Sequence, residues 1–475
     1  MRSSAQLLWA WLPALVAAGM TFPVLGRASL TTDELATWSA SGRSWSELAR
    51  LLHSEDGVFT LYYAAMHLWV DVVGQQPWAL RLPSALAAIA TVALVTHLGR
   101  LATGRRSGGL VAGLLLALNP FFLYYAIDAR PYALVALIAV VTSLLLLTNR
   151  PGTPWSWAAL SVLGVWLQLF YALIALVQWA AVLSSRRYPR SSYVVPGLVV
   201  VGLTVPDAWL GVTQRAQVSW LPHTHWVGYV MWWQHLFGAG DAIALLGAAL
   251  ALLGAVGMVR SRVPSAGMWI GMTALPALAL LTVSWLIPLY DQRYVIESAP
   301  AAALLIAHGA TTAFRARVRS VATATAAITV VLQASPAWAH QHRAYFYENA
   351  GAAAADIMQV SGPHSALVAV PGEARAPLYY YFDRNQDGDL PFTDISVAPD
   401  SAPVVAGNYS GRQRSLRAIS AAASGYRQIV LVTLGEPSFR SVVERLERSL
   451  LRHGFVQSRS TTYGGLTVDL FDRMH

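Results

Sequence analysis

The chain has 475 residues, of which 55% are hydrophobic and only 12% are charged, and its mean hydropathy is +0.46. These values exclude a water-soluble globular protein and indicate a polytopic α-helical membrane protein. The formal net charge of +9 fits loops that face an anionic membrane leaflet, and the absence of cysteine excludes disulfides and thiolate metal sites.

Long apolar segments follow one another along the first 340 residues. The first one, residues 6–25, lacks a clean cleavage site, so we expect a retained signal-anchor helix. Others of suitable length lie at 81–101, 108–126, 129–148, 191–211, 241–259, 266–288, 294–313 and 320–338. The stretch Trp155–Leu183 is too long for one span and predicts two short helices that turn near Gln168–Tyr171. In total we expect about eleven transmembrane helices.

The apolar segment Val58–Gly74 decides the predicted topology, because it contains two ionisable side chains and is barely long enough to span. If it lies in the interface as an amphipathic helix, the later arginine clusters fall on the side of the N-terminus, which the positive-inside rule makes cytoplasmic. If it spans, the first of these clusters moves outside. The interfacial alternative is favoured. It places a first loop of residues 27–80, and everything from His340 onward, on the extracytoplasmic side of the plasma membrane.

The region after residue 340 has a different pattern, with two strand-like runs, one helical run and a last alternating strand. These are Ala366–Val370, Ile429–Leu434, Ser438–His453 and the strand through Leu466, Val468 and Leu470. We therefore divide the chain into a transmembrane domain, 1–339, which includes the external loop 27–80, and a small extracytoplasmic α/β domain, 340–475.

Acidic and basic side chains gather in the predicted external loops. Asp33 and Glu34 open the first loop, Glu55 and Asp56 follow in the same loop, and Arg81 stands where the next span begins. Arg81 taken alone is explained by contact with lipid headgroups. A solvated acidic loop is the simple alternative for Asp33, but acids gain nothing from an anionic leaflet. The pattern therefore favours a functional surface on the outer face.

Two short turns between predicted spans also contain charges and aromatic rings. The first turn contains Asp128 and Arg130, for which a functional role is favoured over a mutual ion pair, because charges near hydrocarbon are costly. In the second turn, Arg293 lies between Tyr290 and Tyr294. An arginine can hold a phosphate through two hydrogen bonds, and tyrosines can line an apolar channel. A lipid phosphate would fit this turn.

Two segments raise the possibility of a metal site. In His223-Thr-His225 the histidines are one residue apart, which is more often just a polar loop. The segment Asp383–Asp394 has the oxygen spacing of a twelve-residue calcium loop, with Gly388 at the turn, but Asp394 stands where glutamate is usual. An acidic turn between strands is the alternative. We predict no metal and no cofactor.

In their order along the chain, these motifs resemble the GT-C superfamily of polyprenyl-phosphate-sugar-dependent glycosyltransferases, near the protein O-mannosyltransferases and the lipid A aminoarabinose transferases. The resembling motifs are Asp33-Glu34, Asp56 before Leu61-Tyr-Tyr63, Arg81-Leu-Pro-Ser84, Tyr124–Tyr132 and Gln292-Arg-Tyr294. The chain differs from such proteins at Val58-Phe-Thr60, where they usually have Pro-Pro.

The resemblance implies a role for each motif residue. Asp33 would be the general base that deprotonates an acceptor hydroxyl, and Glu34 would orient the acceptor. The hydroxyl would attack the anomeric carbon of a sugar phosphate in a single inverting displacement, while cations stabilise the departing phosphate. Substrate-binding residues would be Asp56, Arg81, Asp128, Arg130, Tyr132, Tyr290, Arg293 and Tyr294. Among the arginines, Arg293 is favoured as the phosphate ligand.

The sequence therefore predicts a membrane glycosyltransferase that moves a sugar, mannose first and arabinose next, from a polyprenyl-phosphate donor to a cell-envelope glycan, lipid or protein. The chain has no Gly-rich phosphate fingerprint, which agrees with a lipid-phosphate donor, and we expect no nucleic-acid partner. A flippase or transporter of lipid-linked sugars is one alternative, although it predicts charges at mid-membrane and often two related halves. An inactive scaffold whose soluble domain binds glycan is another.

Overall fold

The computed structural model describes residues 5–218, 221, 223, 226–237, 240–312, 316–343, 348–385, 390–399, 401–435 and 439–474. By their contacts the residues form two compact units. The helical unit contains Met1–Gly26, Asp56–Ala65 and Arg81–His342, and the mixed unit contains Arg27–Glu55, Met66–Leu80 and Arg343–His475. Most of the first loop therefore groups with the C-terminal region.

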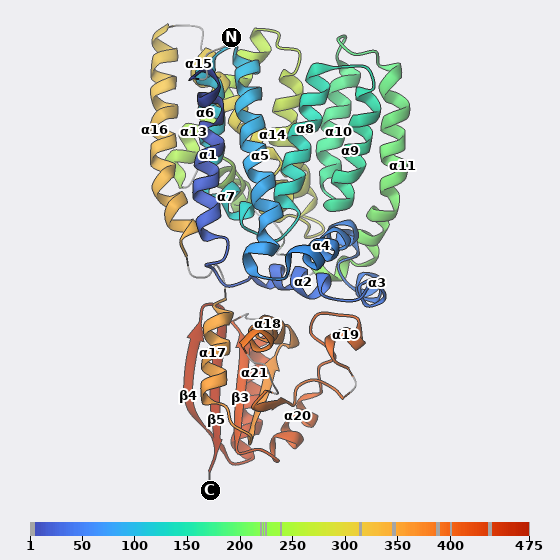
Figure 1. Cartoon of the computed structure of the whole chain (residues 1–475), viewed down its shortest axis with the longest axis vertical. Coiled ribbons are helices and arrows are strands. Elements are labelled where there is room, and N and C mark those ends of the chain that lie inside the picture. Colours follow the sequence, from blue (N-terminus) through green and yellow to red (C-terminus); the bar gives the residue numbers. More distant parts are fainter. Residues whose placement is uncertain are drawn as a thin grey trace. The chain divides into compact units, whose positions relative to one another are not determined.

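The helical unit consists of long helices that run side by side (Figure 1). Its elements are α1 (Ala5–Thr21), η1 (Phe22–Val24), η2 (Gly57–Phe59), the start of α4 (Thr60–Val73), most of α5 (Pro77–Thr103), α6 (Arg106–Ala117), α7 (Pro120–Ala126), α8 (Tyr132–Thr148), α9 (Thr153–Leu167), α10 (Tyr171–Ser184), α11 (Ser191–Thr213), η3 (Arg215–Val218), α12 (Trp226–Phe237), α13 (Asp241–Arg260), α14 (Ala266–Val283), η4 (Gln292–Val295), α15 (Ser298–Thr312) and α16 (Ala316–Gln341).

Helix α15 lies at the centre of this unit, since every residue from Ser298 to Thr311 is buried. It packs on α6, α13, α14 and α16. Glycine permits its close approach to α13, because a Cβ atom on Gly254 would collide with the backbone oxygen of Leu305. Small residues at helix contacts are typical of membrane bundles.

Among the described residues, five helices are long and apolar enough to cross a membrane, and α6 with α7 makes a sixth if this pair, bent by 66°, is one broken span. The five are α5, α11, α13, α14 and the Arg319–His340 part of α16. Shorter apolar helices are Trp11–Val24, Gly57–Val73, Tyr132–Thr148 and Tyr171–Ser184. A mostly helical, polytopic chain is confirmed, and the number eleven stays a prediction.

Two local predictions concern the short apolar helices. The stretch Trp155–Leu183 does form two helices, α9 and α10, with the turn at residues 168–170. The buried Trp157 Nε1 donates to Gln178 Oε1 at 2.9 Å, which joins the two helices. Helix α4 has 14 residues, fewer than the roughly 17–25 that a span needs. The interfacial placement of Val58–Gly74 remains a prediction.

The mixed unit contains a five-stranded sheet of order β2-β1-β3-β5-β4, in which β1 is parallel to β2 and β3, and β5 is antiparallel to β3 and β4. Its elements are α2 (Thr32–Ser41), α3 (Trp45–Ser54), the end of α4, the start of α5, α17 (Ala350–Val360), β1 (Ser365–Val370), η5 (Gly372–Ala374), α18 (Arg375–Asn385), β2 (Phe392–Asp394), α19 (Pro403–Ala406), α20 (Leu416–Ala423), β3 (Gln428–Leu434), α21 (Arg440–Arg452), β4 (Phe455–Tyr463) and β5 (Leu466–Arg473).

Helices cover both faces of this sheet (Figure 1). The helices α17 and α18 bury Ile357 and Leu378 against one face, while α20 and α21 bury Ile419 and Leu446 against the other. The inner strands are apolar on both sides, as expected of strands buried between two helix layers. The strands and the helix predicted in the C-terminal region are therefore confirmed.

The edge strand β4 differs from the inner strands, because most of its side chains are exposed. Its pairing with β5 shifts register between Gln457 and Arg459. Arg459 forms an ion pair with Asp356 of α17, with 3.0 Å between Nη2 and Oδ1. At the opposite edge, β2 has only three residues.

Candidate functional site

Asp33 and Glu34 stand in the first turn of α2, in the mixed unit. Glu34 is 1% exposed and closes a capping box: its Oε2 accepts from the backbone N–H of Thr31 at 2.9 Å, while its own N–H donates to Thr31 Oγ1 at 3.3 Å. Asp33 is half-buried beside it. The observed contacts of Glu34 thus begin the helix, and its predicted role in orienting an acceptor stays a prediction.

Arg81 is fully buried, with 0% exposure, near the start of α5 in the helical unit. Its Nη1 donates to the carbonyl of Leu25 at 2.9 Å. A side chain that reaches lipid headgroups would be exposed. The explanation of Arg81 as a headgroup contact is therefore wrong, because the guanidinium points into protein.

Short polar contacts in the helical unit join Asp56, Tyr63 and Arg130. The Tyr63 hydroxyl donates to Asp56 Oδ2 at 2.7 Å and accepts from Arg130 Nη1 at 2.6 Å. Arg130 Nη1 lies 4.0 Å from Asp56 Oδ2, so the two charges form an ion pair across the tyrosine. Tyr63 and Arg130 are 0% and 5% exposed. A buried charge retained in this way suggests a functional role.

Asp56 has an unusual backbone, because its φ of 55° lies in the left-handed region, which aspartate tolerates better than most residues. Gln214 and Gln217 support this turn, since their Oε1 atoms accept from Gly57 N at 2.7 Å and from Asp56 N at 3.0 Å. The geometry aims the Asp56 carboxylate at Tyr63.

Phe59 belongs to the segment that differs from the usual Pro-Pro pattern. The guanidinium carbon of Arg130 lies 4.5 Å from the centre of the Phe59 ring and 6.0 Å from the centre of the Tyr63 ring. Such cation–π contacts stabilise a desolvated guanidinium. At this position the chain therefore supplies an aromatic surface for Arg130.

The predicted turn of Asp128 and Arg130 lies between α7 and α8, and both residues are buried. The Arg130 N–H donates to the carbonyl of Asp128 at 2.8 Å, and the Arg130 carbonyl accepts from Ser84 Oγ at 3.0 Å. Tyr132, 1% exposed, packs edge-on against Tyr125 with 5.1 Å between ring centres. The charged turn is thus buried and is followed by a tyrosine that packs on another tyrosine.

The second predicted turn carries Arg293 on η4. Asp291 accepts from the Arg293 N–H at 3.1 Å, and its Oδ2 lies 3.5 Å from Arg293 Nε. The Arg293 guanidinium lies 5.7 Å from the Tyr294 ring centre, and that ring packs on Phe170 at 4.9 Å. Burial and the neighbouring Asp291 raise the pKa of the Tyr290 hydroxyl above its ordinary value, which keeps it neutral.

Tyr125, at the end of α7, is buried next to the first of these two turns, and its ring also packs edge-on against Tyr124 with 4.8 Å between ring centres. The helical unit therefore brings together Asp56, Tyr63 and Arg130 at the α7–α8 turn, and Asp291, Arg293 and Tyr294 at η4.

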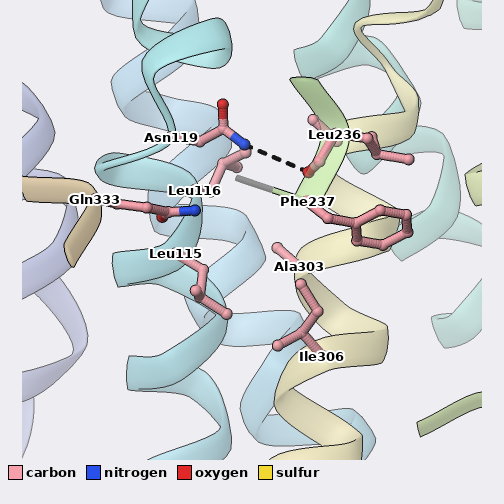
Figure 2. Close-up of a pocket in the computed structure, with 9 residues that line it drawn as sticks. Leu115, Leu116, Asn119, Leu236, Phe237, Ala303, Ile306 and Gln333 are labelled. Atoms are coloured by element: carbon pink, nitrogen blue, oxygen red, sulfur yellow. Dashed lines mark hydrogen bonds between the residues drawn. The ribbon is translucent and has the colours of Figure 1, made fainter. Parts of the chain in front are cut away.

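A small pocket of about 10 Å³ lies among the helices of this unit (Figure 2). Its lining residues are Leu115, Leu116, Asn119, Leu236, Phe237, Ala299, Ala303, Ile306 and Gln333. Asn119 donates to the carbonyls of His235 and Leu236 at 3.3 and 3.4 Å. A pocket of this size has room for about one water molecule, so it does not admit a sugar phosphate.

Neither candidate metal segment is fully within the described residues, since positions 224–225 and 386–389 lie outside them. Asp394, the last candidate calcium ligand, is engaged: its oxygens accept from Arg375 Nε at 2.6 Å, Tyr379 at 3.1 Å and Ser396 Oγ at 2.6 Å. Across the part of the chain that the structure describes, no group of three histidine or acidic residues could hold a metal ion.

The sequence does not reveal the contacts of several residues of the site. The motif Leu61-Tyr-Tyr63 does not show that the Tyr63 hydroxyl bridges two charges, and the segment Val58-Phe-Thr60 does not show that Phe59 contacts Arg130. No sequence pattern singles out Asp291 or Tyr125 as a site residue. Helical periodicity could not have predicted the contact of Asp56 with Tyr63, because Asp56 lies before the helix and has a left-handed backbone.

No protein-family model matches the chain, and no curated protein sequence matches it significantly. The chain is similar in structure to ArnT from Cupriavidus metallidurans in the apo state, with a TM-score of 0.61, 15% identity and coverage of 98% of both chains. A crystal structure of the same ArnT bound to undecaprenyl phosphate matches with a TM-score of 0.59, 14% identity and coverage of 99% of this chain and 98% of that one. The chain has the fold of the GT-C glycosyltransferases.

Proposed function

We propose that this chain is a polyprenyl-phosphate-dependent glycosyltransferase of the plasma membrane. The observation that carries the proposal is the structural likeness to ArnT along 98% of both chains. One of the two ArnT structures has undecaprenyl phosphate bound. The buried, hydrogen-bonded arginines of the helical unit supply the positive charge that a lipid phosphate requires. The expected substrates are a polyprenyl-phosphate-linked sugar and a cell-envelope glycan, lipid or protein.

Arg130 and Arg293 are the proposed phosphate ligands. Each is held by an acid and lies near an aromatic ring, so each guanidinium is oriented before substrate arrives. Arg81 is the third candidate, although one of its N–H groups already bonds to the Leu25 carbonyl. Tyr132, Tyr290 and Tyr294 would line the path of the apolar chain.

Asp33 is the proposed general base. Its carboxylate takes the proton of the acceptor hydroxyl as the acceptor oxygen forms a bond to the anomeric carbon. The bond from this carbon to the phosphate oxygen breaks, and the electron pair leaves with the polyprenyl phosphate. A single displacement of this kind inverts the anomeric configuration. Asp56 and Asp128 would orient the sugar or the arginines.

Mannose is the favoured sugar and arabinose is the alternative. Both sugars fit the same mechanism, so the choice between them depends on the shape of the sugar pocket. We expect the transfer site and the C-terminal region on the extracytoplasmic side, as the positive-inside rule predicts.

The test is transfer of radiolabelled sugar from polyprenyl-phosphate mannose, and separately from polyprenyl-phosphate arabinose, to envelope extract by the purified protein. We expect Asp33→Asn to lose roughly 10²- to 10⁴-fold in rate, as loss of a general base does, with donor binding unchanged. The matched control is Asp71→Asn, because the Asp71 side chain is 64% exposed and contacts His67 at 3.9 Å.

Equal transfer by wild type and Asp33→Asn would remove the base from the proposal. If wild type transferred neither sugar, a flippase or an inactive scaffold would explain the fold better. Transfer of one sugar only would decide between mannose and arabinose.

A further inference from the structure

Helix α2, which carries Asp33, is held by residues from the C-terminal region of the chain. Both belong to the mixed unit. The backbone N–H of Leu30, just before the helix, donates to the hydroxyl of Tyr381 on α18 at 2.9 Å. Leu30 itself is 0% exposed, and the hydrogen bond is partly buried, so losing this hydroxyl leaves the N–H without its protein acceptor.

The same end of α2 has two weaker contacts with the segment before α17. Ser29 Oγ donates to Asn349 Oδ1 at 3.4 Å, and Thr32 Oγ1 donates to Glu348 Oε1 at 3.3 Å. Halfway along α2, the ring of Trp38 packs edge-on against Tyr380, with 5.1 Å between ring centres. Asp33 lies between these contacts in the sequence.

The far end of α2 is held by Arg43, which is 3% exposed. Its Nη2 donates to the carbonyl of Asn408 at 2.6 Å, and its guanidinium lies 5.9 Å from the Tyr409 ring centre. The loop that contains Asn408 is bound again by α3 and the residue after it, because Ser54 donates to the Gly407 carbonyl and Glu55 Oε2 accepts from Tyr409 N at 3.3 Å.

Contacts at the start, middle and end of a ten-residue helix determine its rotation as well as its position. A rotation of one residue step turns every side chain by about 100° around the helix axis. The direction of the Asp33 carboxylate therefore depends on residues more than 300 positions away in the sequence.

We infer that the C-terminal α/β domain positions the α2 helix for catalysis, with Tyr381 and Arg43 as positioning residues that act through Asp33. The inference rests on the proposed function, because it assumes that Asp33 is the base. It assigns a role to a domain that itself carries none of the residues expected to contact substrate.

The test compares Tyr381→Phe with Tyr379→Phe in the full chain. Both tyrosines lie on α18, and each substitution removes one hydroxyl contact. The Tyr379 hydroxyl donates to Asp394 within the C-terminal domain, whereas the Tyr381 hydroxyl accepts from Leu30, just before α2. We expect Tyr381→Phe to lower kcat for sugar transfer about tenfold to a hundredfold, as a small misplacement of a reacting group does, with little change in the KM for the donor. Tyr379→Phe should retain kcat.

A second pair of variants repeats the comparison at the other end of α2. Arg43→Gln removes the buried guanidinium, while Arg50→Gln changes an exposed arginine of α3. We expect a loss of kcat only in Arg43→Gln.

A direct measurement of helix order does not depend on activity. Since the chain has no cysteine, a spin label on Ala36→Cys reports the motion of α2 alone. The label should become more mobile with Tyr381→Phe and with Arg43→Gln, and stay unchanged with Tyr379→Phe.

Unchanged kcat and unchanged label mobility in both α2 variants would overturn the inference. An equal loss of kcat in Tyr379→Phe would overturn it too, because the effect would then come from general destabilisation of the domain. If wild type transferred no sugar, the proposed function would fail, while the spin label would still decide whether the domain holds α2.

Discussion

The hydroxyl of Tyr63 connects the charges of Asp56 and Arg130, as it donates to Asp56 at 2.7 Å and accepts from Arg130 at 2.6 Å. The hydroxyl oxygen of Tyr63 thus lies between Asp56 of the first loop and Arg130 of the α7–α8 turn and holds them at a fixed distance. The guanidinium is oriented by this contact and by the ring of Phe59 beneath it.

We expect Tyr63→Phe to lower transfer roughly tenfold to a hundredfold, because a buried hydrogen bond to a charged group contributes about 1.5–3 kcal/mol. The rate of sugar transfer and donor binding measure the effect. Tyr193→Phe is the control, since Tyr193 is equally buried and loses a 3.1 Å contact with Asn149 away from the site. Full activity of Tyr63→Phe would show that the hydroxyl is dispensable.

Phe59→Leu should lower the affinity for the donor by roughly twofold to thirtyfold, because a desolvated cation–π contact is worth about 0.5–2 kcal/mol. Phe59→Tyr keeps an aromatic face and should bind the donor almost normally. Titration with polyprenyl phosphate measures both. Equal loss in the two variants would indicate a packing defect and not a cation–π effect.

Single cysteines test the predicted topology in this cysteine-free chain. Ser46, Ser107 and Ser424 are suitable positions because all three are exposed. If Val58–Gly74 lies in the interface, a membrane-impermeant reagent applied from outside should label Ser46→Cys and Ser424→Cys but not Ser107→Cys. Labelling of Ser107→Cys would mean that Val58–Gly74 spans the membrane.

Asp394→Asn should destabilise the C-terminal domain by about 3–5 kcal/mol, because it leaves a buried guanidinium without its charge partner. Arg375 is 0% exposed and lies 2.6 Å from Asp394 Oδ2. The matched control is Glu444→Gln, which breaks an exposed pair with Arg440 and should cost at most about 1 kcal/mol. Thermal melting, followed by a fluorophore on Ser424→Cys, measures both.

We expect Glu447 to make the stability of the C-terminal domain depend on pH. Burial, then the charges of Asp469 and Glu444, raise the pKa of its carboxyl above the ordinary 4.5. The protonated form is therefore favoured in the folded state, and its stabilising contribution is lost as the pH rises from 4.5 through the raised pKa. Glu447→Gln should melt at a higher temperature than wild type near neutral pH, with a smaller difference near pH 4.5. A constant difference at all pH values would contradict this.

Local patterns were enough to predict much of the fold. The turn at Gln168–Tyr171 followed from segment length, the turn at Asp128–Arg130 from charges between apolar runs, and the inner strands β1 and β3 from short apolar segments. The antiparallel edge strand β4 was missed, because its exposed and polar side chains give no period-2 signal.

The site was predicted less completely than the fold, because its contacts join residues far apart in the sequence. No local pattern shows that Tyr63 bridges Asp56 and Arg130, since Arg130 lies in the turn between α7 and α8, far from the other two residues in the sequence. For the same reason the explanation of Arg81 as a headgroup contact was wrong: burial depends on neighbours such as Leu25, which only the fold brings close.

The two edges of the C-terminal sheet limit aggregation through strand pairing. An exposed edge strand can pair with a strand of another molecule, yet β2 is too short to offer a long template, and β4 is interrupted at Gln457 and Arg459. The charge of Arg459 further opposes such pairing. A domain with these edges can remain free of sheet-to-sheet pairing at high local density, as in a membrane crowded with copies of the same chain.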